Sequence, residues 1–196
     1  YIINHGGAEI IVVDEDLLPS LEPLAARLAG VRHWIVSSES GEWQSSLPGA
    51  VDYETFIGTQ SAEFEWPEFD ENASLGLCYT SGTTGRPKGV MYTHRSTYLH
   101  SFAEAMTDTM SMSATDSVCA IVPMFHAMAW GLPFTAMMLG AKQVFPNRFM
   151  TPSELLDLMV NEEVTLAGGV PTIWQGVRGA IEAQPERWDL SKLDRV

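Results

Sequence analysis

The sequence has 196 residues, of which 45% are hydrophobic and 18% charged, an ordinary composition for a globular protein with one substantial core. Its 25 acidic and 11 basic residues give a formal net charge of −14, which argues against a nucleic-acid partner because phosphates attract clustered lysine and arginine. No apolar run approaches the roughly 18 residues of a membrane span, so the sequence predicts none.

The first third of the chain predicts two strands separated by a helix. The stretches EIIVVD (9–14) and VRHWIV (31–36) are typical of buried strands, and four leucines at helical spacing predict a helix that Gly30 ends. Residues 37–74 are acidic and contain Ser, Gly and Pro. We predict a long surface connection there, with a short helix near 53–57.

Regular structure is predicted again from residue 75. Strands at 75–80 and 89–94 flank a glycine-rich stretch, and a helix begins near Arg95, with His94 and Arg95 expected as structural capping groups. The residues expected on one apolar face of this helix are Leu99, Phe102, Ala103, Met106 and Met110.

The remaining residues alternate strands with helices. Buried strands are predicted at 117–124, 142–145 and 164–169, and a further strand is expected to begin near 192–196. This alternation predicts an α/β domain with a largely parallel sheet. Because the chain opens at Tyr1 inside an apolar pattern, we expect a fragment that is truncated at both ends.

Two helices lie between these strands. The helix at 151–163 carries its own start signal, with Thr151 as the cap, Pro152 at the first helical position and Glu154 three residues after the cap. The residues expected to face inward from the helix at 171–183 are Ile173, Trp174, Val177 and Ile181.

The two cysteines, Cys78 and Cys119, each lie in an apolar stretch. Two isolated thiols are typical of reduced core residues in a cytoplasmic protein and not of a disulfide framework. The sequence contains no CxxC or HExxH pattern and no internal repeat.

The stretch YTSGTTGRPKGV (79–90) has the chemistry of a phosphate-binding loop. Its glycines permit close approach of backbone N–H groups to an anion, its hydroxyl side chains are donors, and Lys88 adds a mobile charge. It differs from the Walker loop because Pro87 stands directly before Lys88, and from the dinucleotide fingerprint because no helix follows it at once. The alternative is a flexible surface hairpin.

This stretch resembles the phosphate-loop motif of the adenylate-forming superfamily, which contains acyl-CoA synthetases, luciferases and peptide-synthetase adenylation domains. Further segments resemble bacterial fatty-acyl-CoA synthetases, and the likeness covers nearly the whole chain except the acidic connection. These segments are YIINHGGAEIIVVDEDLLPSLEPL (1–24), MYTHRSTYLH (91–100), VPMFHAMAWGLPF (122–134), GAKQVF (140–145) and GGVPTIW (168–174).

The resemblance implies the layered αβ sheet subdomains of the large N-terminal domain of these enzymes. Residues 1–196 would form part of that AMP-binding domain, 75–196 would carry the phosphate loop and the acyl pocket, and the C-terminal domain would be absent. The implied reaction joins a fatty acid, or a related carboxylic acid, to AMP from ATP and then transfers the acyl group to coenzyme A. The fragment alone is expected to be inactive.

Two alternatives stay open beside this reaction. One is an adenylate-forming enzyme with another acceptor, luciferase-like or loading a carrier protein, and the other is a non-catalytic nucleotide-binding module. The resemblance implies ATP, Mg²⁺, coenzyme A and a small-molecule carboxylate as ligands. Relatives often dimerise, so a homodimer is expected.

The resemblance also assigns residues of the loop. Thr80 would lie near Mg²⁺, and Lys88 and Thr84 are the catalytic candidates in the loop. Arg86 would add attraction for the polyphosphate or would be a solvated surface arginine. The residues implied around the β- and γ-phosphates are Ser81, Gly82, Thr83, Thr84, Gly85 and Lys88.

A second set of candidates follows the strand at 117–124. His126 would lie near the substrate carboxylate and the adenylate, or it would be a core histidine with a backbone partner. Trp130, four residues later, could share a helical face with His126 and line or gate the acyl tunnel, or it would be core packing. The turn containing Gly169, Val170 and Pro171 would approach the acyl pocket. The methionines that fit a pliable wall for an alkyl chain, or an ordinary core, are Met124, Met128, Met137 and Met138.

Overall fold

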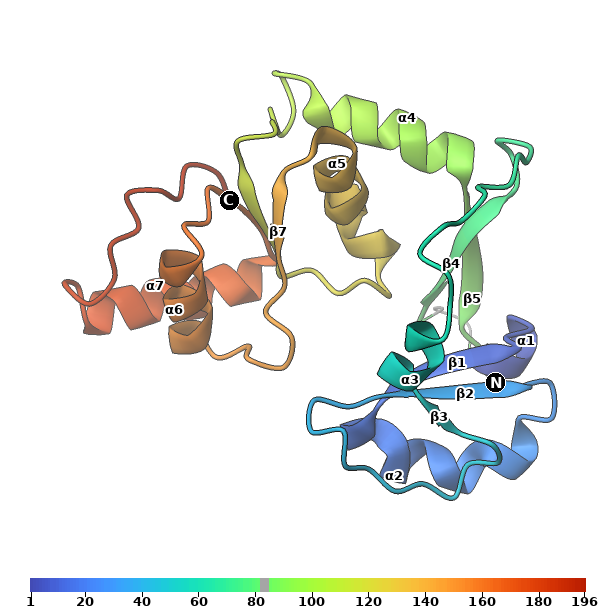
Figure 1. The fold of residues 1–196 in the computed structure, drawn as a ribbon. Helices are drawn as coiled ribbons and strands as arrows, with labels where there is room; N and C mark the ends of the chain where they lie inside the picture. Colours follow the sequence, from blue (N-terminus) through green and yellow to red (C-terminus); the bar gives the residue numbers. More distant parts are fainter. Residues whose placement is uncertain (82–84) are drawn as a thin grey trace. The chain divides into compact units, whose positions relative to one another are not determined.

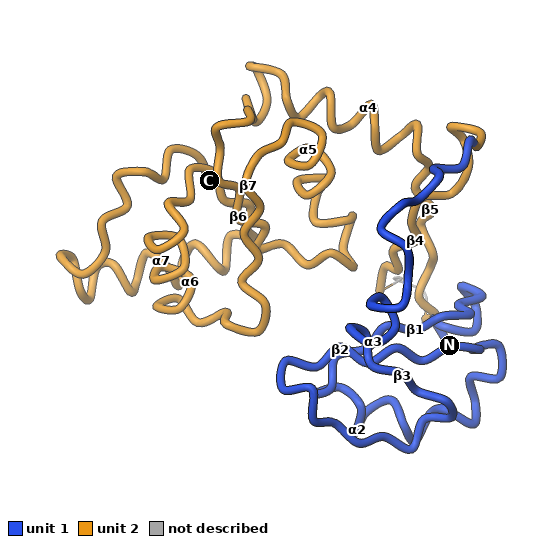
Figure 2. The backbone as a smooth tube through the Cα atoms, in the orientation of Figure 1, with its two compact units in different colours: residues 1–68 blue, residues 69–196 orange. Residues whose placement is uncertain are grey.

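The computed structural model describes residues 1–81 and 85–196 (Figure 1). The chain divides into two compact units, residues 1–68 and residues 69–196 (Figure 2). Parallel strands connected by helices are present in both units, which confirms the predicted α/β class. Among the described residues, no helix combines the length and apolar character needed to cross a membrane.

Unit 1 is built on a three-stranded parallel sheet. Its strands β1 (Ile10–Asp14), β2 (His33–Ser37) and β3 (Val51–Asp52) lie in that order. The helix predicted after the first strand is divided into short segments, because Pro19 and Pro23 each lack the N–H that a continuous helix needs. The helical segments of this unit are α1 (Ile2–His5), η1 (Glu15–Leu17), α2 (Leu18–Leu21), η2 (Glu22–Arg27) and α3 (Tyr53–Gly58).

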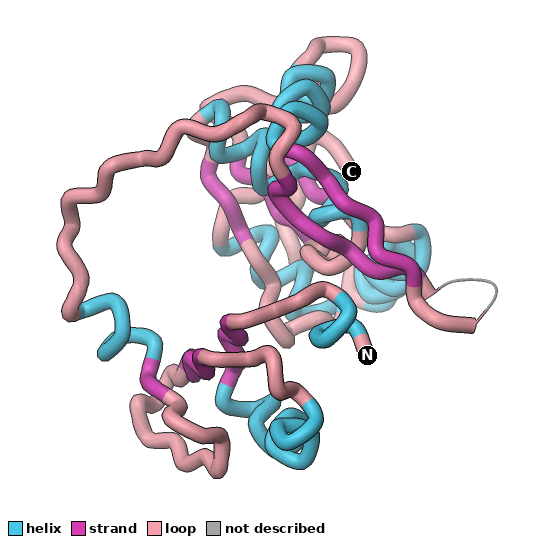
Figure 3. The backbone as a smooth tube through the Cα atoms, turned by 90° about the vertical axis from the view of Figure 1, so that its right-hand side faces the viewer, coloured by secondary structure: helices cyan, strands magenta, loops and turns pink. Residues whose placement is uncertain are grey.

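The acidic stretch 37–74 contributes to unit 1 over its first part. Leu47 is buried in the core of the unit and Trp43 packs against it, while the Asp52 carboxylate caps the predicted short helix α3 by accepting a hydrogen bond from the N–H of Thr55 at 2.9 Å. Between α3 and the next strand the chain has no helix or strand, and Figure 3 shows this part as a long loop. Trp66 in this loop is 83% exposed.

Unit 2 begins with the antiparallel pair β4 (Ser74–Thr80) and β5 (Lys88–Thr93). A three-stranded parallel sheet follows, in the order β7 (Lys142–Val144), β6 (Ser117–Ala120), β8 (Leu166–Gly168). Its helical segments are α4 (His94–Ala105), η3 (Ala127–Gly131), α5 (Leu132–Leu139), α6 (Pro152–Asn161) and α7 (Pro171–Ala183).

The central strand β6 is covered on both faces. Successive side chains of a strand point to opposite faces, so Cys119 joins a core with Leu155 and Leu156 of α6, whereas Val118 and Ala120 join a core with Leu132 of α5. Both cysteines are buried and free, as predicted for core thiols.

The start signal predicted for α6 is confirmed. The Thr151 hydroxyl accepts from the N–H of Glu154 at 3.4 Å, and the Glu154 carboxylate accepts from the N–H of Thr151 at 3.0 Å, with Pro152 in the first turn. The inward face predicted for α7 is also confirmed, because Val177 is buried while Ile173, Trp174 and Ile181 pack against the same core.

The face predicted for α4 is wrong. Leu99 and Phe102 are 53% and 50% exposed, and the buried residues of the helix are the polar Thr97, Ser101 and Glu104. Hydrophobic spacing failed to predict the buried face because Glu104 has a buried polar partner, Thr135 of α5. Such a partner permits burial of a polar face.

The predicted caps of α4 also differ from the structure. Thr93 is the cap: its hydroxyl accepts from the N–H of Ser96 at 3.0 Å, and the Ser96 hydroxyl accepts from the N–H of Thr93 at 3.0 Å. His94 is the first helical residue and Arg95 pairs with Glu71 at 2.5 Å, so neither is the cap.

The strand expected at the end of the chain is reduced to a single parallel bridge between Leu166 and Arg195. The Arg195 guanidinium donates to the carbonyl oxygens of Met110 and Ser111, each at 2.8 Å, and pairs with Asp116. These bonds join the last residues to the segment that leads into β6.

Candidate functional site

The glycine-rich stretch connects the two strands of an antiparallel hairpin, as predicted. Thr80 is the last residue of β4 and pairs directly with Lys88, the first residue of β5. Directly opposed residues of antiparallel strands project their side chains from the same face, so Thr80 and Lys88 lie on one face of the hairpin where the loop begins and ends. Ser81 follows Thr80 and is exposed. Gly82, Thr83 and Thr84 lie outside the described residues.

The described part of the loop has the properties of an anion site. Gly85 has φ +120°, a conformation that side chains disfavour, and it occurs where the chain turns back towards β5. Lys88 is exposed and forms no ion pair with any residue in 1–81 or 85–196. A cation without a carboxylate partner beside a glycine-rich turn can attract a polyphosphate.

Strand β4 packs against the segment that contains His126. A Cβ on Gly76 would lie 2.8 Å from Cε of Met128, so the end of the Met128 side chain packs directly over the backbone of β4 at this glycine. The Cys78 thiol lies 3.9 Å from the carbonyl oxygen of Met124. The strand that leads into the glycine-rich loop therefore contacts the chain on both sides of His126.

His126 is exposed and stands at the N-cap of η3, beyond the carboxyl end of β6. The shared helical face expected for His126 and Trp130 is absent, because residues 127–130 have φ between 45° and 59° and form a left-handed turn. Left-handed geometry costs about 1–2 kcal/mol per non-glycine residue, so surrounding contacts must stabilise this turn.

Side chains of α4 contact this turn, and the sequence analysis missed them. The His100 Nε2 atom lies 2.8 Å from the carbonyl oxygen of Trp130. The buried Glu104 accepts a hydrogen bond from Thr135 of α5 at 2.5 Å and lies 3.3 Å from His100. Burial raises the pKa of the Glu104 carboxyl, while Thr135 and His100 act in the opposite direction. The sequence could have indicated this pair through the i, i+4 spacing of His100 and Glu104, which makes the two side chains neighbours on a helix.

Trp130 lines two cavities. The larger, of about 620 Å³, is bounded by β5, α4 and η3, and the smaller, of about 390 Å³, by the β8–α7 turn. The first is lined by Tyr92, Ser96, Thr97, His100, Glu104, Met110, Ala127, Met128, Trp130 and Gly131. The second is lined by Thr109, Met110, Trp130, Leu166, Ala167, Gly168, Gly169, Trp174, Arg195 and Val196.

The turn between β8 and α7 reaches the smaller cavity through Gly169. Its carbonyl oxygen accepts from the Trp174 indole at 2.9 Å, and a Cβ on Gly169 would meet that ring at 3.2 Å. Val170 caps α7 and Pro171 begins it; both are exposed and neither lines the cavity. The structure therefore brings together Trp130 and Gly169 among the residues predicted for substrate binding.

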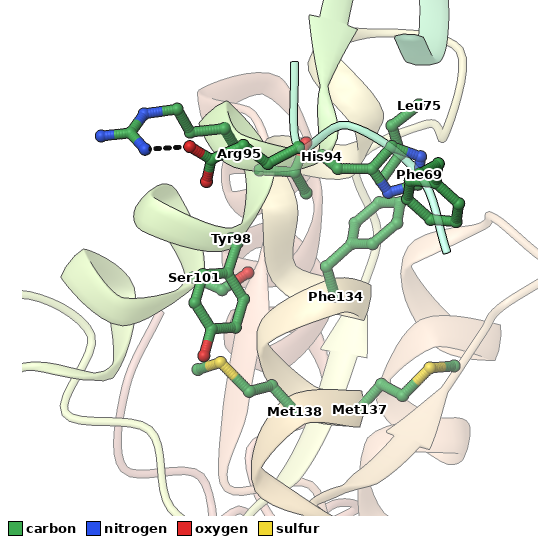
Figure 4. A pocket seen from close by; sticks show the side chains of 11 residues that line it. Phe69, Leu75, His94, Arg95, Tyr98, Ser101, Phe134, Met137 and Met138 are labelled. Carbon is green, nitrogen blue, oxygen red and sulfur yellow. Dashed lines mark hydrogen bonds and ion pairs between the residues drawn. The ribbon is translucent and has the colours of Figure 1, made fainter. Parts of the chain in front are cut away.

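A third cavity, of about 480 Å³, lies between α4 and α5 (Figure 4). Met137 and Met138 line it from α5 and Tyr98 from α4, while the His94 ring lies tilted against Phe69 with ring centroids 4.3 Å apart. Met128, by contrast, lines the 620 Å³ cavity. Met124 lines neither cavity and is 49% exposed, so the four methionines predicted to form an alkyl wall do not lie along one cavity.

The whole chain, residues 1–196, matches a protein-family model described as AMP-binding enzyme. It is 42% identical over 181 residues to a medium-chain-fatty-acid–CoA ligase of Ectopseudomonas oleovorans, with 92% of this chain and 33% of the relative covered. It is 46% identical over 178 residues to a 3-methylmercaptopropionyl-CoA ligase of Ruegeria lacuscaerulensis, with 90% and 33% covered.

The fold is similar to that of solved structures of comparable enzymes. A long-chain-fatty-acid-CoA ligase from Archaeoglobus fulgidus matches with a TM-score of 0.80 and 25% identity, over 98% of this chain and 36% of that one. The chain spans about a third of the length of the curated relatives that it matches.

Proposed function

The chain belongs to the family of AMP-binding enzymes, and we propose that its protein converts a fatty acid, or a related carboxylic acid, into a coenzyme A thioester. In the first step the carboxylate attacks the α-phosphorus of ATP, which gives an acyl-adenylate and releases pyrophosphate. In the second step the thiol of coenzyme A attacks the acyl carbon, AMP leaves, and the thiol proton is released. The observation that carries the proposal is the phosphate-loop hairpin packed against a turn whose Trp130 lines two cavities.

The loop hairpin is proposed to hold the β- and γ-phosphates. The pairing of Thr80 with Lys88 and the turn at Gly85 support this role. Donors and cations fixed around phosphates stabilise the charge that moves onto the leaving pyrophosphate. The proposed phosphate-binding residues are Ser81, Gly82, Thr83, Thr84, Gly85 and Lys88, of which Thr84 and Lys88 would contact the reacting phosphates.

Mg²⁺ is proposed near Thr80. The exposed Thr80 offers a hydroxyl oxygen, which is a hard ligand of the kind Mg²⁺ accepts, beside the loop that would hold the phosphates. When bound, the ion would neutralise part of the phosphate charge.

The acyl group is proposed to extend from His126 towards Trp130. His126 follows the carboxyl end of β6, where parallel α/β sheets collect their ligands, and would lie near the substrate carboxylate. The cavities beside Trp130 supply space for an alkyl chain. The turn with Gly169, Val170 and Pro171 is proposed to bind the acyl group on the side of the smaller cavity. The position of Gly169 in the wall of that cavity supports this proposal most directly.

We also propose a homodimer in the cytoplasm. The resemblance to fatty-acyl-CoA synthetases supports the dimer. The two buried free thiols support a reducing compartment.

The test is exchange of labelled pyrophosphate into ATP by the full-length protein, with a panel of fatty acids and amino acids. We expect exchange with fatty acids, and thioester formation after coenzyme A is added. Exchange with amino acids alone would overturn the fatty-acyl assignment. Exchange with fatty acids but no thioester would assign another acceptor.

A further inference from the structure

The polar pair His100 and Glu104 lies outside the residues assigned to phosphate or substrate. Both side chains project from α4 towards the left-handed turn at 127–130. They also form part of the wall of the 620 Å³ cavity, together with Met128 and Trp130 of the turn. The pair therefore connects a rigid helix to the part of the cavity wall that has the least favourable backbone geometry.

His100 contacts the turn at two consecutive residues. Its Nε2 atom lies 2.8 Å from the carbonyl oxygen of Trp130, so an N–H on this atom would donate to that oxygen. The next residue, Gly131, has φ +84°, and a Cβ there would lie 2.4 Å from the imidazole ring. The ring therefore occupies space that only glycine leaves free, and it fixes the end of the turn from one side.

Glu104 orients His100 and joins α4 to α5. One carboxylate oxygen accepts from the Thr135 hydroxyl at 2.5 Å, and the other lies 3.3 Å from His100 Nε2. Thr135 in turn lies 3.3 Å from the carbonyl oxygen of Gly131. Glu104 is 6% exposed, and a buried carboxylate is stable only where such partners surround it.

A purely structural helix contact is the simpler explanation for this pair. It does not account for the place of the contact, which is the carbonyl of Trp130, a residue that, like Met110, lines both cavities. A change in the contact would move the Trp130 backbone and with it the wall between the two cavities. The pair is therefore placed to affect how far an acyl chain can extend.

We propose that His100 and Glu104 are positioning residues that hold the left-handed turn and thereby set the range of acyl lengths that the site accepts. This inference rests on the proposed function. His100 acts through the Trp130 carbonyl and Glu104 acts through His100 and Thr135.

The test compares His100→Leu, His100→Gln and Glu104→Gln in the full-length protein with a series of saturated fatty acids. We expect His100→Leu to change the ratio of kcat/KM between the best acid and acids four carbons longer or shorter by about 3- to 10-fold, the size expected for one lost hydrogen bond. The KM for ATP should not change. His100→Gln retains an N–H donor and should restore most of the wild-type ratio, and Glu104→Gln should give an intermediate ratio.

Leu99→Ala is the matched control, because Leu99 lies on the exposed face of the same helix and lines none of the three cavities described above. It should leave the length profile unchanged. An unchanged profile in His100→Leu, or an equal loss for every acid, would overturn the inference and leave a structural contact only.

Hydrogen–deuterium exchange of the peptide that covers 126–135 tests, independently of activity, whether His100 and Glu104 hold the left-handed turn. We expect faster exchange in His100→Leu and near wild-type exchange in His100→Gln and Leu99→Ala. Equal exchange in all variants would overturn the inference. A wild-type protein without any adenylation would instead overturn the proposed function, and the exchange experiment would still decide whether the pair holds the turn.

Discussion

Lys88 illustrates how a single residue links the sequence to the proposed chemistry. Lys88 is paired with Thr80 across the hairpin, and its amine has no acidic partner among the described residues. A mobile cation in this position is available to phosphate oxygens that approach from the loop. The described residues of the loop belong to neither core of unit 2, so we expect substitutions there to leave the fold intact.

We expect Lys88→Ala in the full-length protein to slow adenylate formation roughly 10- to 100-fold, because one charged contact to phosphate is worth about 1.5–3 kcal/mol. Pyrophosphate exchange measures the rate, and circular dichroism should show an unchanged fold. Lys192→Ala, which removes an exposed lysine outside the hairpin, is the control. Unchanged kinetics in Lys88→Ala, or an unfolded variant, would contradict the assignment.

The sequence predicted the hairpin that carries the loop better than the arrangement around Trp130. The hairpin depends on local chemistry, since glycine, proline and hydroxyl residues act within a few positions. The arrangement around His126 depends on contacts from α4 and β4, which are distant in sequence. Nothing in the segment 126–131 except Gly131 favours a left-handed turn, so helical spacing suggested the wrong relation between His126 and Trp130.

At the scale of elements, prediction succeeded where apolar spacing and end signals agreed. In α6 the capping pair and the buried leucines indicate the same helix, and the structure has both. In α4 the apolar spacing was present, but the buried face is the polar one because the buried Glu104 accepts a hydrogen bond from Thr135 of α5. A partner on another helix is invisible to the periodicity of a single segment.

The capping box of α6 provides a test at this scale. We expect Thr151→Ala to lower the free energy of unfolding of unit 2 by about 1 kcal/mol, because the mutation removes the hydroxyl that accepts from the N–H of Glu154. Thermal unfolding followed by circular dichroism measures the loss. Ser153→Ala, inside the first turn, is the control and should have a smaller effect. An equal loss of stability in the two variants would show that the loss in Thr151→Ala does not come from the cap.

At the scale of the whole molecule, each unit contains its own core. The core of unit 1 consists of residues between 3 and 50, and the two cores of unit 2 consist of residues between 110 and 193. Unit 1 has the smaller core, and small cores bury a smaller fraction of their surface, so unit 2 should be the more stable. The predicted α/β class was correct for both units, because alternating strands and helices specify the class.

The loop between α3 and β4 gives the final prediction. It has no helix or strand, its Trp66 is 83% exposed, and it carries Glu63, Glu65, Glu68 and Glu71. Proteolysis needs an extended backbone, so a glutamate-specific protease should cut the polypeptide 1–196 first in this loop. Mass spectrometry would identify the products, and the C-terminal product should keep its circular dichroism signal and resist further cutting. Replacing the four glutamates with glutamine should slow the first cut. A first cut beyond residue 75, or an unfolded C-terminal product, would show that unit 2 lacks a stable core of its own.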